Sequence, residues 1–429
     1  MSTCFAGLEG CIIVTINLSA AIVSPDIAAQ ANGLLYLCFA LMAFLAPPIV
    51  RHIGAKTSMV LSMALYLLYL ASYIAAHPVV MLVNAAVGGC AGALLWVAQG
   101  VYFTRNALAY DEACAAGSTG TSCRIFGADS ISAFAGVFAT TFQLAVTLAK
   151  QSSCVLLTLF PEDRTVLFAA LTVAGAACTV AMLAILPLRH GSCRSGNLFV
   201  LLCDYRALLL TPYNVAFGVA TAFFPVHITV LTKDAFGGDT AAVCWMYTIA
   251  GLSSATAAAL AAVASQRISW ARACTMLLGS LSFGAACLLV ALGVRDGGPE
   301  GPQVNPVLLG AMYVCFGLGV AAWQGSCMAT VGHLFRDDPR AAFAHLKLTS
   351  GIPSALGFFL LPRLSLRHAA LATCGASAVG ALGLVALLVM PQQGETVAVE
   401  TNESGADGRG APTTARGFES QFHHLNVRE

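Results

Sequence analysis

The sequence predicts an all-helical membrane protein with about twelve spanning helices, on the strength of three observations. Of the 429 residues, 58% are hydrophobic and only 10% are charged, whereas soluble proteins carry roughly 25% charged residues. The mean hydropathy is +0.80. The apolar residues also gather in stretches of about 20, the length that a helix needs to cross the hydrocarbon of a bilayer. Most of the chain is therefore expected to face lipid.

The elements follow from these stretches, because in lipid each spanning segment must satisfy its own backbone hydrogen bonds. The first six predicted spans are Thr3–Val23, Ala31–Val50, Thr57–Ala76, Val79–Phe103, Gly127–Ala149 and Thr165–Leu188. The second six are Ala207–Leu231, Thr240–Ser265, Trp270–Val294, Val307–Val331, Ala341–Leu361 and Ala369–Met390. The first of them is unusual, because it contains Glu9 and starts almost at Met1.

Basic residues orient this stack, because Lys and Arg are retained on the cytosolic side of short loops. With the N-terminus in the cytosol, eleven of them fall in inner loops and six, including Lys150, in outer loops. Both termini are therefore predicted to be cytosolic, in the plasma membrane or an endomembrane. The expected organisation is a six-helix half (residues 1–188), a central cytosolic loop (189–206), a second six-helix half (207–390) and a disordered cytosolic tail (391–429).

Several functional classes find no support in the sequence. The net charge of +1 offers no basic surface for nucleic acid. The sixteen cysteines include no C-x-x-C pair, and most stand inside apolar runs, so we interpret them as small hydrophobic residues and expect no metal site. Walker and nucleophile-elbow motifs are also missing. We therefore expect no enzymatic activity and no cofactor.

Two patterns recur between the predicted spans n and n plus six. Arg51 and Lys56 follow the second span, and Arg267 and Arg272 follow the eighth with the same five-residue spacing. In the fourth span Gly92 precedes Trp96 and Gln99, and in the tenth span Gly319 precedes Trp323 and Gln324. A parallel repeat of six plus six spans is the arrangement of the major facilitator superfamily, in which the substrate path lies between two helical halves near the midplane.

Two longer motifs resemble one branch of that superfamily. The run GGCAGALLWVAQGVYFT, residues 88–104, is similar to the fourth-span signature of the Unc-93-like family. Trp323-Gln324, followed by Leu334-Phe335 and by the run AAFAHLKL at residues 341–348, resembles its tenth span and the start of its eleventh. The resemblance implies the facilitator fold. It also implies one of two roles, namely transport, or a partnership with ion channels or receptors.

Two departures from the family pattern affect the expectations. The family usually has Gly-Leu-Gln near the middle of its first span, whereas Gly7-Leu8-Glu9 stands at the start of this chain, so we expect the N-terminus to be truncated. The loop after the second span keeps Gly54 and Lys56, which the resemblance implies as a conformational loop. Arg51 occupies the place of the acid found in that loop motif, so the charge latch built on this acid is in doubt.

Placing polar side chains at membrane depth is energetically unfavourable, so residues found there are candidates for a functional role. Five of them could line a substrate cavity or simply link helices, and we favour the cavity because the fourth and tenth spans flank the central path. These are Trp96, Gln99, Gln143, Trp323 and Gln324. Glu9 is either a proton-carrying group in the cavity or an interfacial residue. Lys347 is either a counter-charge in the cavity or an anchor that snorkels to the interface.

The sequence leaves two functions open. The first is a secondary transporter or facilitator of a small organic solute that works by alternating access, with Glu9 as coupling group and the Trp and Gln side chains as binding surface. The second is a non-transporting regulatory subunit of an ion channel or a trafficking partner of membrane receptors. The lipid bilayer is the surrounding partner in both.

Overall fold

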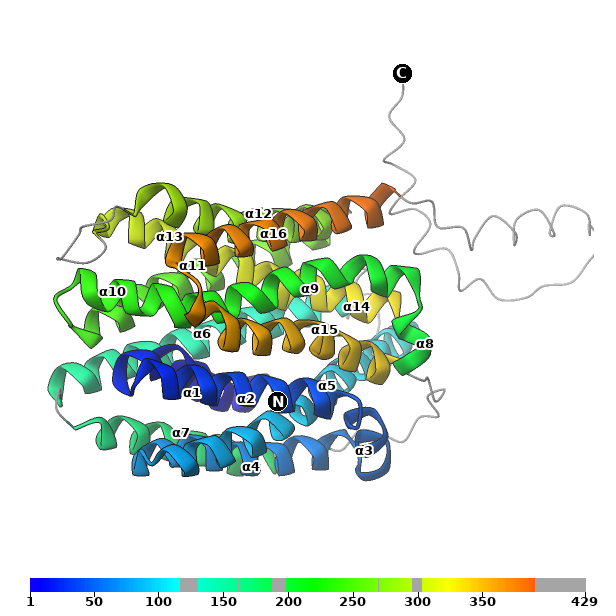
Figure 1. Ribbon diagram of the computed structural model, residues 1–429. Helices are drawn as coiled ribbons and strands as arrows, with labels where there is room; N and C mark the ends of the chain where they lie inside the picture. The colour runs from blue at the N-terminus through cyan, green and yellow to red at the C-terminus, as the bar shows by residue number, and fades with distance from the viewer. Residues whose placement is uncertain (116–129, 161–162, 187–197, 269, 295–302, 390–429) are drawn as a thin grey trace, which may run out of the picture.

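A computed structural model describes residues 1–115, 130–160, 163–186, 198–268, 270–294 and 303–389, and nearly all of them lie in helices (Figure 1). The first helices are α1 (Ser2–Ile22), α2 (Pro25–Ala43), α3 (Ala46–Ile53), α4 (Ala55–Ala75), α5 (Pro78–Ala115), α6 (Ser130–Leu159), α7 (Arg164–Met182) and α8 (Leu198–Leu202). They are followed by α9 (Tyr205–Phe223), α10 (Thr229–Ala235), α11 (Thr240–Arg267), α12 (Ala271–Gly293), α13 (Pro306–Ala322), α14 (Met328–Leu334), α15 (Pro339–Leu360) and α16 (Leu366–Val389). The predicted all-helical class is confirmed.

Eleven helical segments of the described residues are long and apolar enough to cross a membrane. The helix α15 has 22 residues but is not among them, because His345 and Lys347 lower its hydropathy. Those same residues give α15 ionisable side chains. Across the described part of the chain, eleven apolar helices and one polar helix of spanning length therefore correspond to the twelve predicted spans.

Short polar side chains fix where many helices begin. The carboxylate of Asp204 accepts a hydrogen bond from the backbone N–H of Arg206 at 2.8 Å, and Asp239 accepts one from Ala241 at 2.8 Å. Such N-caps satisfy backbone donors that the first helical turn leaves open. N-cap side chains also begin three other helices, namely α7 at Asp163, α13 at Asn305 and α15 at Asp338.

The second predicted span, Ala31–Val50, is wrong at both ends. The helix α2 begins six residues earlier at Pro25, because proline suits the first helical position, where its missing N–H is not needed. It ends at Ala43, and the separate helix α3 runs from Ala46 to Ile53. Gly54, at φ +83°, then turns the chain directly into α4, a conformation that side chains with a Cβ rarely adopt.

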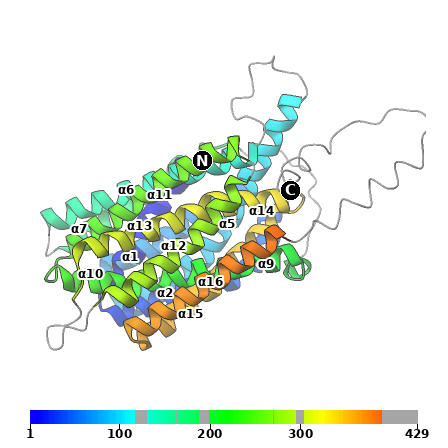
Figure 2. The same ribbon diagram turned by 90° about the horizontal axis from the view of Figure 1, so that it is seen from above.

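Two helices extend beyond their predicted ends. The helix α5 continues twelve residues beyond Phe103, and its 38 residues span about 57 Å, compared with about 30 Å of hydrocarbon. Figure 2 shows the cyan end of α5 projecting beyond the other helices. The helix α6 continues to Leu159. Lys150, which we predicted in an outer loop, therefore lies inside a helix and is 6% exposed.

Both the seventh and the tenth spans are interrupted by one π-helical turn. The turn η1 (Phe224–Ile228) joins α9 to α10, and the turn η3 (Trp323–Cys327) joins α13 to α14. Single π-turns inside α-helices are rare and are frequent at functional sites. The η3 turn contains the predicted site residues Trp323 and Gln324.

The helices of residues 1–182 and those of residues 205–389 lie mostly on opposite sides of the bundle in Figure 1. They meet most extensively where α2 packs against α15 and where α6 packs against α11. Part of the predicted central loop, residues 189–206, is helical, since it contains α8 and the start of α9. The predicted tail, residues 391–429, lies outside the described residues.

Candidate functional site

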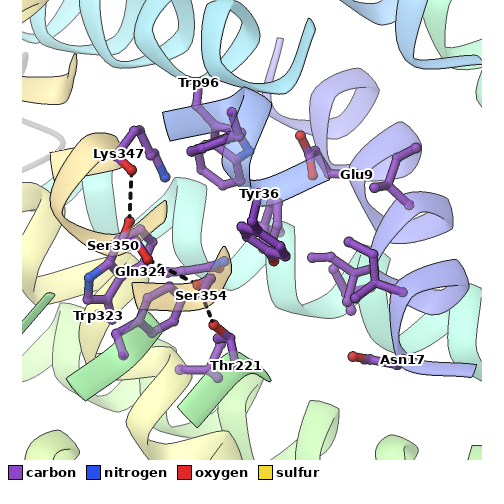
Figure 3. A pocket seen from close by; sticks show the side chains of 18 of the residues that line it. Glu9, Asn17, Tyr36, Trp96, Thr221, Trp323, Gln324, Lys347, Ser350 and Ser354 are labelled. Carbon is purple, nitrogen blue, oxygen red and sulfur yellow. Dashed lines mark hydrogen bonds between the residues drawn. The ribbon is translucent and has the colours of Figure 1, made fainter. Parts of the chain in front are cut away.

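A cavity of about 130 Å³ lies between the two groups of helices (Figure 3). Its walls come from α1, α2, α4, α5, α6, α9, α13, η3 and α15. Of the seven cavity residues predicted from the sequence, six line it: Glu9, Trp96, Gln143, Trp323, Gln324 and Lys347. An engineered apolar cavity of about 150 Å³ holds benzene, so this one has room for a small organic molecule.

The ammonium group of Lys347 lies between two indole rings. Its Nζ atom is 3.6 Å from the ring centroid of Trp96 and 4.4 Å from that of Trp323. Lys347 is 3% exposed, and a desolvated cation over an aromatic face is stabilised by about 2 kcal/mol or more. The two tryptophans that correspond in the sequence repeat therefore hold the same cation, one from α5 and the other from η3.

The ring of Trp323 is held from two sides. It stacks on Phe217 with a centroid distance of 3.8 Å, and its indole N–H donates to Oδ1 of Asn214 at 3.1 Å. The side-chain amide of Asn214 in turn donates to Oγ1 of Thr349 at 3.0 Å. Asn214 was not among the site residues predicted from the sequence, although a buried amide at membrane depth is a signal of this kind of support.

Replacing Asn214 with alanine should destabilise the protein by about 1–3 kcal/mol, because the buried indole N–H of Trp323 would lose its acceptor. Thermal unfolding of the purified protein would measure the change. Asn84→Ala is the matched control, because that amide is exposed and bonds only within its own helix, and it should stay within about 0.5 kcal/mol. Equal effects of the two variants would contradict the support proposed for Trp323.

Trp96 is held by an aromatic cluster on the opposite side of the cavity. Its ring meets Phe5 edge to face at a centroid distance of 4.8 Å and lies 5.5 Å from Phe142. Phe138 completes the cluster, 5.5 Å from Phe5 and 5.8 Å from Phe142. Aromatic pairs in such geometry contribute beyond their buried area. The wall that carries Trp96 is therefore tightly packed rather than loosely filled.

Glu9 is buried inside the helical bundle. It is 3% exposed and lines the cavity from α1. Its Oε1 atom has no hydrogen-bond partner among the described residues, and Lys347 lines the same cavity from α15. In the view of Figure 3, the ring of Trp96 lies between these two side chains. Glu9 and Lys347 thus place opposite charges in one cavity.

The two glutamines of the cavity link α6 to η3. The Nε2 atom of Gln143 donates to Oε1 of Gln324 at 2.7 Å. Gln99, in contrast, does not line the cavity, and neither of its amide atoms has a hydrogen-bond partner among the described residues. It lies one helical turn beyond Trp96, toward the end where Phe103 and Phe343 pack at a centroid distance of 5.7 Å. The expectation that Gln99 faces the cavity therefore needs correction.

Lys150 is a cavity residue that was not predicted from the sequence. Lys150 lines the cavity from α6, and its Nζ atom is 5.1 Å from the ring centroid of Tyr247. A signal was present in the sequence, because Gln143, Val146 and Lys150 follow one another at helical spacings of three and four and share one face. All three line the cavity.

The predicted conformational loop lies away from this cavity. Gly54 ends α3, and Lys56 stands in the first turn of α4, and neither lines the cavity. Among the residues that the structure describes, no group of three or more His, Cys, Asp or Glu is placed to hold a metal ion.

Comparisons with known proteins agree on sequence family and on fold. A sequence model of the family described as "Ion channel regulatory protein UNC-93" matches residues 27–388. No individual curated protein matches the chain in sequence. Among solved structures, the chain is similar to the nucleoside transporter NupG, with a TM-score of 0.60 at 14% identity over 91% of this chain and 98% of that one.

Two further solved structures show the same likeness. The proton:xylose symporter XylE, of the major facilitator superfamily, has a TM-score of 0.62 at 11% identity, covering 90% of this chain and 93% of that one. The human organic anion transporter MFSD10 has a TM-score of 0.60 at 15% identity, covering 90% and 98%. At such identities the likeness shows the major facilitator fold alone.

Proposed function

This chain belongs to the UNC-93 family and has the major facilitator fold, and from that premise we propose that it carries a small organic solute across a membrane by alternating access. The observation that carries the proposal is the central cavity, in which Trp96 and Trp323 hold Lys347 and which also contains Glu9. Solute sites in this fold lie between the two groups of helices. Both termini are placed in the cytosol in this proposal.

Contacts on both sides of the cavity support a gated path. Near the end of α1, Lys233 donates to the carbonyl of Ala21 at 2.7 Å, and Thr229 donates to that of Asn17 at 3.2 Å. At the opposite end, Phe103 packs against Phe343. Each contact joins residues 1–188 to residues 207–390, which we propose to rock as two bodies.

Replacing Trp96 with alanine should lower solute uptake at least about tenfold. The ring lines the cavity and holds Lys347 there, and a desolvated cation–π contact of this kind is worth about 2 kcal/mol. The assay is uptake by liposomes that contain the purified protein, scanned over a panel of solutes. Trp245→Ala is the matched control, because that ring is 49% exposed on α11 and does not line the cavity. If no solute shows saturable uptake, or if both variants behave alike, transport through this cavity is wrong.

The family description favours a second candidate function, regulation of an ion channel, because the family is described as that of an ion channel regulatory protein. Such a role needs no solute path. Co-purification of one channel or receptor with the full chain, together with absent uptake over the whole panel, would support it in place of transport.

A further inference from the structure

Two of the four lysines in the chain line the central cavity. Lys150 is 6% exposed and Lys347 is 3% exposed. Among the described residues, the contacts of these two ammonium groups are with aromatic rings, and neither forms a salt bridge with an acid within 4 Å. Charged groups are seldom buried without partners, because their desolvation costs several kcal/mol. Lys347 at least lies over two indole rings, so the surroundings of Lys150 indicate that something else satisfies its charge.

The charges of the cavity do not balance. Glu9 is the single acidic residue among its lining side chains, against the two lysines. With all three groups ionised, the cavity carries one positive charge in excess. The remaining polar groups that line it are neutral amides and hydroxyls, namely Asn17, Tyr36, Tyr66, Gln143, Thr221, Gln324, Ser350 and Ser354. A single negative charge on a bound solute would restore neutrality.

The two lysines differ in how far the protein itself compensates them. Lys347 has two indole faces and the charge of Glu9. Lys150 has one aromatic ring, that of Tyr247, at a longer distance of 5.1 Å, and the thiols of Cys154 and Cys244 near it, but no carboxylate other than that of Glu9 lines the cavity. A compact ammonium without a carboxylate partner is a site for an anion. The uncompensated positive charge therefore lies at Lys150.

The rest of the cavity is apolar and small. Ile12, Ile16, Val146, Phe316 and Val320 are among its lining residues, and the volume of about 130 Å³ is comparable to the roughly 150 Å³ cavity that binds benzene. Such walls suit a hydrocarbon body and leave little room for a solute with many hydroxyl groups. The solute would thus be amphipathic, with one charged end.

We propose that the solute is a small organic monoanion, with a carboxylate that binds Lys150 and an apolar body no larger than about a benzene ring. This inference rests on the proposed solute site and adds the chemical class of the solute. The carboxylate neutralises the excess charge of the cavity, while Glu9 and Lys347 compensate each other. A neutral analogue of the same shape would leave Lys150 uncompensated, and a cationic analogue would add to the excess.

The test compares three probes of nearly equal shape on the purified full-length protein. Benzoate, benzamide and benzylamine carry a negative, neutral and positive charge at neutral pH, and binding is followed by thermal unfolding and calorimetry. We expect benzoate to raise the unfolding temperature and to bind at least about tenfold more tightly than either analogue. Benzamide or benzylamine binding as tightly as benzoate, or no binding by any probe, would overturn the proposal.

Variants locate the site and separate this inference from the proposed transport. Lys150→Met should abolish the preference for benzoate over benzamide, Lys150→Arg should keep it, and Arg363→Met, which removes an exposed cation outside the cavity, should leave it unchanged. A preference that survives Lys150→Met contradicts the assignment to Lys150. If benzoate binds as expected but liposomes take up no solute, the anion site stands and transport is wrong.

Discussion

Replacing Lys347 with methionine is expected to destabilise the protein by about 1–3 kcal/mol, since the buried carboxyl group of Glu9 would lose a positive charge that lies in the same cavity. Methionine has nearly the same length and makes favourable sulfur contacts with aromatic rings, so the space between Trp96 and Trp323 would stay filled. The loss would then report the charge of Glu9, which is 3% exposed. Thermal or denaturant unfolding of the purified protein measures it.

A double variant tests whether the stability lost in Lys347→Met comes from the uncompensated charge of Glu9. Glu9→Gln combined with Lys347→Met removes both charges, and replacing a whole buried pair by groups of similar shape is often close to neutral. We therefore expect the double variant to regain most of the stability that Lys347→Met loses. Leu348→Met, a neighbouring volume-conserving change in the same helix, should cost less than about 1.5 kcal/mol. If the losses of the two single variants simply add, Glu9 and Lys347 do not interact.

This expectation also separates two interpretations of Lys347 that the sequence left open. A lysine about two turns into a helix can extend along it and reach the interface. In the structure, however, the ammonium group is held between the two indole rings inside the bundle. The hydropathy of α15 cannot distinguish these placements, because it contains no information on which rings face Lys347.

Much of the fold could be predicted from the sequence because its main determinant, the surrounding lipid, acts on every residue. Composition and the length of the apolar stretches predicted the helical class. The repeat of Trp96 and Trp323 predicted two rings on one path, because both stand in the same place in corresponding spans. The predicted cavity residues on α1, α5, α6, η3 and α15 all came from one rule, the high cost of polar groups at membrane depth.

The errors arose where local effects override hydropathy. Lys150 was placed in a loop because a charge normally ends an apolar stretch, yet α6 continues past it to Leu159. Pro25 began a helix that hydropathy alone places later. Gln99 shares a helix with Trp96, yet it does not line the cavity. Such outcomes depend on tertiary contacts that spacing along the chain does not encode.

The largest effect on folding is expected at Gly89, where α5 approaches α2. A Cβ atom at this position would overlap the carbonyl oxygen of Leu35, and it would lie 2.9 Å from Cβ of Cys38. Because the first obstacle is backbone, it cannot swing away as a flexible side chain would. Spanning helices gain stability from such close approach at small residues. Gly89→Ala should therefore cost about 1–3 kcal/mol, and Gly89→Leu should prevent folding.

The second half of the chain shows the same close helix packing as α2 and α5. In α13 a Cβ atom on Gly317 would overlap the carbonyl oxygen of Ala250 in α11, so the tenth span approaches the eighth as the fourth approaches the second. In both places the glycine stands within two turns of the tryptophan that contacts Lys347. Because Gly89 and Trp96 stand on the same helix, we expect a shift of α5 at Gly89 to displace Trp96 as well.

Gly375 provides the matched control, because it lies within α16 and a Cβ there would meet no atom within 4 Å. Alanine or leucine at Gly375 should leave folding intact, and alanine should even stabilise the helix by up to about 1 kcal/mol through its higher helix propensity. The measurements are the yield of monodisperse protein and its unfolding temperature. A Gly89→Leu variant as stable as Gly375→Leu would show that α2 and α5 can separate at little cost, and the coupling between packing and the cavity would then be wrong.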